Sequence, residues 1–121
     1  MNFYKRMSLV CALIPEGCVA TYRQIALLCG KPKNSRQVGY GLNHDLAGPD
    51  VPAHRIVNSK GILSGAASFD FPDLQKRLLE EEGVEVTGMP VAWQVDLKIY
   101  GWKHTFDQAE HLFMLFQKEG I

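Results

Sequence analysis

The residues Pro52 to Arg55, sequence PAHR, are the most pointed chemical feature of the chain. A proline, a small residue, a histidine and an arginine follow one another just before a predicted turn. That arrangement is suited to holding a reactive side chain at its second position. The second position is Ala53, and the methyl group of alanine can do no chemistry. The segment therefore has the surroundings of a reactive residue without the residue itself.

The three cysteines are not expected to supply the missing nucleophile. Cys11, Cys18 and Cys29 are odd in number, stand at no metal-binding spacing and precede the PAHR segment. A nucleophilic thiol needs an adjacent base, and Cys29 falls near the end of a predicted helix, where apolar neighbours are expected. We expect reduced, mostly buried thiols in a cytoplasmic protein, with no metal site and no cofactor.

The charges are balanced in number but uneven along the chain. Lys and Arg total 13, as do Asp and Glu, yet the segment 1–65 has a net charge of +5 and the segment 66–121 a net charge of −5. Such asymmetry indicates one surface that faces a polyanion; a chance split with no shared face is the alternative. We find no apolar run long enough to span a membrane and no signal peptide, so we expect no membrane segment.

The first half of the chain predicts a helix-turn-helix. Apolar residues at helical spacing predict a helix over 3–14. A second helix begins at Thr21, which with Gln24 forms the Ser/Thr-x-x-Glu/Gln capping box, and Gly30 suits the left-handed residue that closes it. Asn34 is predicted to cap a third helix, SRQVGYGLNHDL. Two short helices joined by a tight turn are typical of this motif.

The third predicted helix contains two glycines, which are unfavourable inside a helix and therefore need an explanation. Gly39 and Gly41 each cost about 1 kcal/mol relative to alanine inside a helix. One explanation is the close approach of another backbone, such as that of a nucleic acid. The other is tight packing against the second helix, and the sequence favours neither.

The second half predicts smaller elements around this motif. Residues 55–64 resemble a hairpin with NSKG as its turn, in the position of a wing. Asp70 is predicted to cap a helix that has Pro72 in its first turn and ends at Gly83. The alternation over 91–100 predicts a strand or a pair of short strands. A last amphipathic helix over 106–118 places Leu112, Phe113 and Phe116 on one face, to cover the core or to meet a partner. The expected fold is mainly α with small β elements, a winged helix-turn-helix-like domain.

Several motifs, in order, resemble one known family. IPEGCVATYRQIALLCGKPKNSRQVGYGL, VPAHRIVNSKGILSG and LLEEEGVEV are similar to the DNA-binding domain of the O6-alkylguanine-DNA alkyltransferases. That family has PCHRV where this chain has PAHRI, TYG.IA where it has TYRQIA, and R.VG where it has RQVG. The likeness covers about Leu9 to Val86. VDLKIYGWKH resembles the ending of the alkyltransferase-like subgroup, in which the acceptor cysteine is replaced.

The resemblance implies a non-enzymatic DNA damage sensor. It would bind O6-alkylguanine in double-stranded DNA, flip the nucleotide out of the helix and direct the lesion to nucleotide excision repair. Its expected partners are such DNA and the damage-recognition proteins of that pathway, and the chain is expected to be a monomer. The expected domain covers residues 1–104, with residues 105–121 as a helical extension of it.

The family also implies roles for individual residues. Arg36 would fill the stack from the minor groove, since its planar charged fork can stack and hydrogen-bond at once, and Tyr22 would stand beside the target phosphate. His54 and Glu82 would be the vestigial proton-handling pair, with Arg55 paired to Glu82. The other expected DNA contacts are Thr21, Arg23, Lys31, Lys33, Ser35, Gly39, Ser59 and Lys60. The expected lesion pocket is Pro52, Ala53, His54, Arg55, Ile56, Ser64, Gly65 and Ala66.

Two departures from the family pattern bear on this pocket. Ala66 stands where many transferases have a tyrosine, so with Ala53 it would leave room for O6-alkyl groups larger than methyl. Asp45 aligns with a family asparagine that joins the helix-turn-helix to the active-site loop, although Asn43 is nearby. A carboxylate can replace the acceptor role of that amide but not its donor role.

Two other functions remain open on the sequence. The first is a true transferase inactivated by exchange of its cysteine for Ala53. The second is a winged-helix transcription regulator, which would want base-reading side chains on its second helix and usually a dimer.

Overall fold

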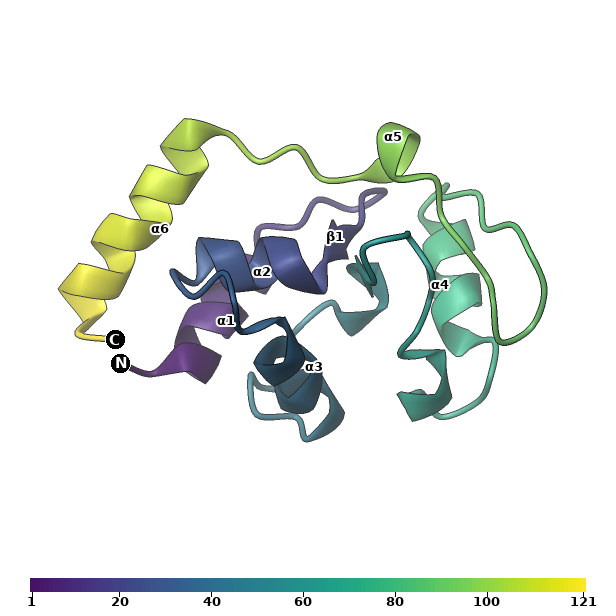
Figure 1. Ribbon diagram of the computed structural model, residues 1–121, viewed down its shortest axis with the longest axis horizontal. Helices are drawn as coiled ribbons and strands as arrows, with labels where there is room; N and C mark the ends of the chain where they lie inside the picture. The colour runs from purple at the N-terminus through teal and green to yellow at the C-terminus, as the bar shows by residue number, and fades with distance from the viewer.

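The computed structural model describes residues 1–121 and is mainly helical with one small sheet, as the sequence predicts. In chain order the elements are α1 (Phe3–Cys11), β1 (Ala20–Thr21), α2 (Tyr22–Leu28), α3 (Ser35–Asn43), the 3₁₀ turn η1 (Ala53–Arg55), β2 (Ile56–Val57), the 3₁₀ turn η2 (Ala66–Ser68), α4 (Leu74–Glu81), α5 (Leu97–Tyr100) and α6 (Phe106–Glu119). Helices α1 to α3 form the middle of the molecule, with α6 on one side and α4 on the other (Figure 1).

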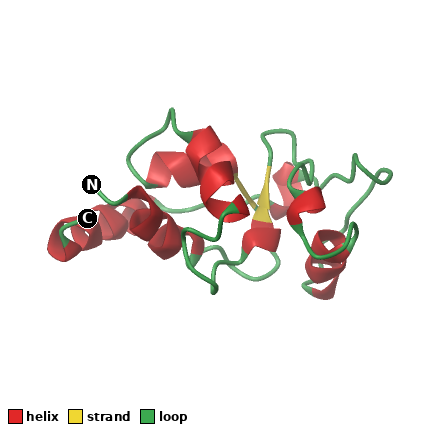
Figure 2. Ribbon diagram, turned by 90° about the horizontal axis from the view of Figure 1, so that it is seen from below, coloured by secondary structure: helices red, strands yellow, loops and turns green.

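The sheet joins two segments that are far apart in the sequence. β1 and β2 are parallel, with Ala20 opposite Ile56 and Thr21 opposite Val57, and they lie between the helices (Figure 2). The predicted hairpin over 55–64 is therefore wrong. Both residues of β2 are buried, which is typical of a strand covered on both faces and able to pair in parallel. The NSKG turn itself exists, because Asn58 Oδ1 accepts the N–H groups of Lys60 and Ile62 at 2.9 Å each.

The helix-turn-helix is present, but its caps differ from the expectation. Thr21 accepts the N–H of Gln24 at 3.1 Å, whereas the Gln24 amide donates to the carbonyl of Trp102 at 2.7 Å instead of returning to Thr21. Only half of the capping box forms because this tertiary contact takes its glutamine. Asn34 makes no cap bond and donates to Gln37 at 2.8 Å. Gly30 closes α2 with a φ of +83°, as predicted.

Tight packing explains the glycine at position 41, although Gly41 packs against α1 and not against α2 as expected. A Cβ placed on Gly41 would lie 2.8 Å from the Tyr4 ring of α1 and 3.2 Å from Met7. Real Cβ atoms do not approach this closely, so α1 rather than α2 requires this glycine. A Cβ on Gly39 would lie 3.9 Å from the Tyr22 ring of α2, an ordinary contact. Packing therefore does not forbid a larger residue there.

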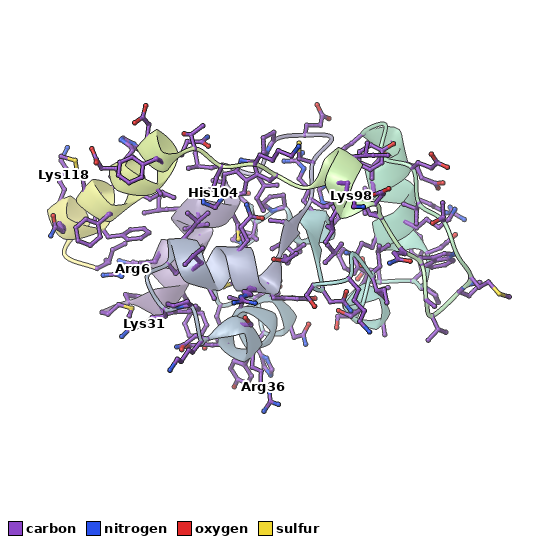
Figure 3. All side chains as sticks on the ribbon, turned by 45° about the horizontal axis from the view of Figure 1, so that its top comes forward. Arg6, Lys31, Arg36, Lys98, His104 and Lys118 are labelled. Atoms are coloured by element: carbon purple, nitrogen blue, oxygen red, sulfur yellow. The ribbon has the colours of Figure 1, made fainter.

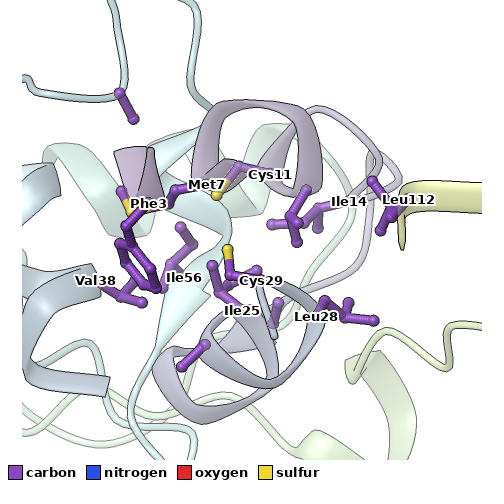
Figure 4. Packing of buried hydrophobic residues seen from close by; sticks show 14 of the residues in the cluster. Phe3, Met7, Cys11, Ile14, Ile25, Leu28, Cys29, Val38, Ile56 and Leu112 are labelled. Carbon is purple, nitrogen blue, oxygen red and sulfur yellow. The ribbon is translucent and has the colours of Figure 1, made fainter. Parts of the chain in front are cut away.

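Two hydrophobic clusters hold the elements together. The larger one joins α1, α2, α3 and β2 and also takes in Leu112 and Phe116 of α6 (Figure 4). The smaller one consists of Val19, Val57, Leu63, Leu79, Val84 and Val95. Helix α1 ends at Cys11, earlier than predicted, because Leu13 and Ile14 bond to carbonyls three residues back and tighten the last turn. Ile14 is nevertheless buried.

The segment from 70 to 100 corrects two predictions. Helix α4 begins at Leu74, and Asp70 does not cap it; Asp73 stands at the cap position but pairs with Arg77 at 2.8 Å. Residues 91–100 form no continuous strand; only Gln94 makes β-bridges, antiparallel to Ile62 and to Thr87. Val91 is 97% exposed, and Asp96 accepts the N–H of Lys98 to start the short helix α5. A helix-capping aspartate therefore outweighs the apolar alternation.

Helix α6 has nearly the predicted bounds and returns to the first helix. Thr105 and Gln108 form a complete capping box. Arg6 Nε donates to the carbonyl of Ile121 at 2.9 Å, so the two ends of the chain lie together (Figure 1). Of the three residues predicted to share one apolar face, Leu112 and Phe116 are buried, whereas Phe113 is 58% exposed. No helix combines the length and the apolar character needed to cross a membrane.

Candidate nucleic-acid interface

A cavity of about 210 Å³ lies where α2, α3, α4 and the PAHR loop meet. Tyr22 of α2 and Ala53 of η1 both line it. The remaining lining residues are Leu42, Asn43, Asp45, Ile56, Gly65, Ser68, Phe69, Asp70, Leu74 and Gln75. Segments from four separate parts of the chain therefore converge on the residue that lacks a reactive group.

The structure divides the expected lesion pocket into three places. Ala53, Ile56 and Gly65 line the cavity. Ser64 and Ala66 line an adjoining apolar hollow of about 410 Å³, which shares Phe69 and Asp70 with the cavity. Pro52, His54 and Arg55 line neither space. Pro52 stands at the start of η1, and the other two side chains bind Glu82.

Tyr22 is held in a narrow space across the cavity. A Cβ placed on Gly65 would lie 3.0 Å from the Tyr22 hydroxyl oxygen, and one on Gly39 would lie 3.9 Å from the Tyr22 ring. Tyr22 also begins α2 directly after the Thr21 cap. The absence of a side chain at residue 65 therefore leaves the Tyr22 hydroxyl its present position, and a Cβ there would require a shift of a few tenths of an ångström.

Glu82 fastens the PAHR loop to the body of the protein. His54 Nε2 donates to one of its oxygens at 2.6 Å, and Arg55 donates through Nε and a terminal nitrogen at 2.8–3.1 Å. The backbone N–H of Gly17 donates to the same carboxylate at 3.0 Å. A second terminal nitrogen of Arg55 donates to the carbonyl of Ile14 at 3.0 Å. The predicted Arg55–Glu82 pair is thus part of a larger network.

The charge of Glu82 follows from this network. Burial by itself would raise the pKa of its carboxyl group, but hydrogen bonds from Arg55, His54 and the Gly17 backbone outweigh burial and lower the pKa to about 2. An ionised Glu82 only accepts hydrogen bonds, so Nε2 of His54 carries the proton between them. With a methyl group at Ala53, this histidine has no thiol to act upon and serves to orient the loop.

The positions of the three cysteines, and the raised pKa values of two of them, do not suit a nucleophile. Cys11 and Cys29 are fully buried, their sulfur atoms lie in the larger cluster (Figure 4), and neither lines the cavity. Burial, with repulsion between the two thiolates as a further cause, raises the pKa of Cys11 to about 12. Burial also raises the pKa of Cys29 to about 12, although Arg6 acts in the opposite direction. Cys18 is partly buried and does not line the cavity.

Arg36 lies on the helix that reaches the cavity, but it does not line the cavity. It is exposed in the first turn of α3 and projects away from the protein (Figure 3). Asn43, at the other end of α3, does line the cavity. A rise of 1.5 Å per residue puts about 10 Å of helix between the two positions. One helix therefore connects the free arginine to the cavity.

The other expected DNA contacts fall into two groups. Arg23, Lys31 and Lys33 are exposed on α2 and the turn after it, with Ser35 and Gly39 partly buried on α3; Lys31 and Arg36 project from the same edge of the molecule (Figure 3). Ser59 and Lys60 instead line a separate hollow beside α5, together with Asp96 and Lys98. The family resemblance had grouped all of them as DNA contacts, and that grouping stays a prediction.

Several cavity residues were missed from the sequence. Asp70, Leu74 and Gln75 reach the cavity because the start of α4 packs beside the PAHR loop. One signal was available, since Gln75 is a polar residue among Leu74, Leu78 and Leu79 on a predicted apolar helix face. It is 1% exposed, and its amide donates to the carbonyls of His54 at 3.3 Å and Ile56 at 3.1 Å.

Comparison with known proteins connects this geometry to one family. Residues 2–84 match the model of the family described as "6-O-methylguanine DNA methyltransferase, DNA binding domain". The chain is 40% identical to the DNA base-flipping protein of Escherichia coli over 105 residues, which cover 85% of this chain and 76% of that protein. It is 37% identical to alkyltransferase-like protein 1 of Schizosaccharomyces pombe over 103 residues, covering 84% and 95% of the two chains.

A solved structure agrees with these sequence matches. The crystal structure of S. pombe Atl1 in complex with damaged DNA containing O6-carboxymethylguanine superposes with a TM-score of 0.75 at 37% identity, covering 84% of this chain and 95% of that one. The chain is thus an alkyltransferase-like member of the family defined by the DNA-binding domain of 6-O-methylguanine DNA methyltransferases.

Proposed function

We propose that this protein is a non-enzymatic sensor of alkylated DNA, which flips an O6-alkylguanine out of the duplex into the cavity around Ala53 and leaves the alkyl group in place. The observation that carries the proposal is the shared cavity of Tyr22 and Ala53. A rigid aromatic hydroxyl faces the space where a base would lie, while the position of a nucleophile holds only a methyl group.

The DNA would lie along α3. Extrusion of a base costs a few kcal/mol, and the gap that it leaves must be filled. Arg36 is exposed on this helix, and its guanidinium can stack between bases and donate hydrogen bonds at the same time. Arg23, Lys31 and Lys33 would add phosphate contacts, which give affinity without choice of sequence. The relatives named for base flipping and for binding damaged DNA support the extrusion of a damaged base.

The chemistry of the cavity supports binding without transfer. Removal of an alkyl group requires a thiolate positioned for in-line attack on the alkyl carbon. Residue 53 has no sulfur, and the two buried cysteines have pKa values of about 12, so neither forms a thiolate at neutral pH. The His54–Glu82 pair would then serve the shape of the loop rather than proton transfer. Handover of the flagged lesion to nucleotide excision repair completes the proposal.

The affinity for a duplex with one O6-methylguanine, compared with the same duplex carrying guanine, tests the proposed function. A sensor binds the lesion duplex more tightly at equal salt concentration, whereas a sequence-reading regulator ignores the lesion. Equal affinity for the two duplexes would remove the basis for a lesion sensor.

A further inference from the structure

The walls of the cavity around Ala53 carry negative charge and no positive charge. Asp45, after the end of α3, and Asp70, before α4, both line it, and no Lys, Arg or His is among the lining residues. Other carboxylates close to α4 have cationic partners, as Asp73 does in Arg77 and Glu80 does in Lys76. Neither Asp45 nor Asp70 forms a salt bridge.

Gln75, which also lines the cavity, carries a buried oxygen whose partial charge is negative as well. Both donors of the Gln75 amide are committed to the carbonyls of His54 and Ile56, which fixes the orientation of this side chain. Its Oε1 is buried without any hydrogen-bond partner. An amide oxygen accepts hydrogen bonds and cannot donate them, and a buried acceptor left unpaired is costly. Gln75 therefore contributes an unpaired acceptor and no free donor.

The backbone fixes where one of the carboxylates stands. Asp45 has a φ of +53°, a left-handed conformation that only glycine, asparagine and aspartate adopt readily. The turn that begins there is closed by the N–H of Gly48, which donates to the carbonyl of Asp45. Asparagine tolerates the same conformation, so the charge can be removed while the turn is kept.

We infer that this cavity selects lesions by the charge of the O6 substituent, favouring neutral or cationic groups over anionic ones. The inference rests on the proposed function, since it assumes that the flipped base enters here. The carboxylates of Asp45 and Asp70, two exposed residues that line the cavity, repel an added carboxylate and attract groups that donate hydrogen bonds. The neutral donors of Tyr22, Asn43 and Ser68 can bind an uncharged or an anionic substituent alike, so the difference between the two comes from the carboxylates.

An isosteric pair of lesions tests the inference. The anionic probe is O6-carboxymethylguanine, the adduct in the Atl1 complex, and the neutral probe is O6-carbamoylmethylguanine of nearly the same shape. We expect the wild-type protein to bind the neutral adduct about tenfold more tightly at low salt, with a smaller gap at high salt. The Asp45→Asn/Asp70→Asn double variant should reduce the ratio to about two or less. Asp50→Asn removes an exposed charge outside the cavity and should leave the ratio unchanged.

A second pair of lesions tests the charge preference with the wild-type protein alone. The wild-type protein should bind a cationic O6-(2-aminoethyl) adduct more tightly than the neutral O6-(2-hydroxyethyl) adduct. Equal affinity within both pairs, with O6-methylguanine still preferred over guanine, would overturn the charge selection and leave the proposed function standing. Failure to prefer any of these lesions over guanine would overturn both.

Discussion

The hydroxyl of Tyr22 and the methyl group of Ala53 belong to residues that line one cavity, although the first residue begins α2 and the second stands in the loop before β2. The parallel pairing of β1 with β2 brings these two segments together. Gly65 completes the arrangement, since a Cβ there would lie 3.0 Å from the Tyr22 hydroxyl. The shape of the cavity thus depends on Gly65, which has no side chain, as well as on the side chains of Tyr22 and Ala53.

Gly65→Ala should weaken lesion binding through Tyr22. The new methyl group displaces the hydroxyl by a few tenths of an ångström, and we expect a three- to tenfold loss of affinity for the O6-methylguanine duplex, equivalent to about 1 kcal/mol. The loss caused by Gly65→Ala should be smaller in a Tyr22→Phe background, where the clashing oxygen is absent. Titration of both single variants and the double variant checks this; additive losses would contradict the contact.

Arg36→Ala should lower the preference for damaged DNA, because nothing would fill the stack after the base leaves. We expect the ratio of lesion to undamaged affinity to fall by about tenfold or more, since extrusion costs a few kcal/mol. Lys33→Ala is the matched control, an exposed cation on the turn before the same helix. It should weaken binding to both duplexes equally and reduce the salt dependence by about one phosphate contact. An unchanged ratio in Arg36→Ala would exclude the intercalating role.

The Glu82 network should make stability depend on pH in the acid range. Its pKa is lowered in the folded protein from 4.5 to about 2, so the unfolded chain takes up the proton first as the pH falls. The stabilisation is therefore fully present above about pH 5 and is lost towards pH 2, with a size of about 3 kcal/mol. Urea unfolding of the wild type across this range should show the loss.

Two variants separate this effect from general acid unfolding. Glu82→Gln should already be destabilised by about 3–5 kcal/mol at pH 7, because Arg55 loses its charged partner, and should show a flatter pH dependence. Glu85→Gln, an exposed neighbour, should behave as the wild type does. The same pH dependence in Glu82→Gln and the wild type would contradict the assignment.

The cavity should accept O6 substituents larger than methyl. It adjoins an apolar hollow of about 410 Å³ lined in part by Ser64 and Ala66, and each buried methylene group contributes about 0.8 kcal/mol. Affinity along a series from methyl to benzyl should therefore hold or increase. Ala66→Tyr should reduce binding of the benzyl adduct and spare the methyl adduct. A steep fall with substituent size in the wild type would refute this route.

Local chemistry predicted the elements that depend on neighbours in sequence. The left-handed Gly30 just after α2 and the bounds of α6 follow from backbone conformation and caps, and the family motifs correctly joined Arg55 to Glu82. The hairpin failed because Ile56 pairs with Ala20, a partner that no local pattern specifies.

The sequence predicted the residues of the candidate site that belong to family motifs. It did not predict the residues that only tertiary packing brings to the cavity. The family motifs indicate Ala53 and Gly65 as pocket residues and Tyr22 as a residue beside the target phosphate, and all three line the cavity. Asp70 and Gln75 were missed because the start of α4 reaches the cavity only through tertiary packing beside η1. A sequence motif identifies the residues of the loop around Ala53. The residues of α4 on the opposite wall of the cavity can be identified only from the fold.

The mass of the protein recovered from its complex with an O6-methylguanine duplex tests most directly whether this chain recognises the lesion without repairing it. The account predicts a complex that forms in preference to one with the undamaged duplex, and a recovered protein of unchanged mass. A recovered protein heavier by one methyl group, with guanine restored in the DNA, would contradict it.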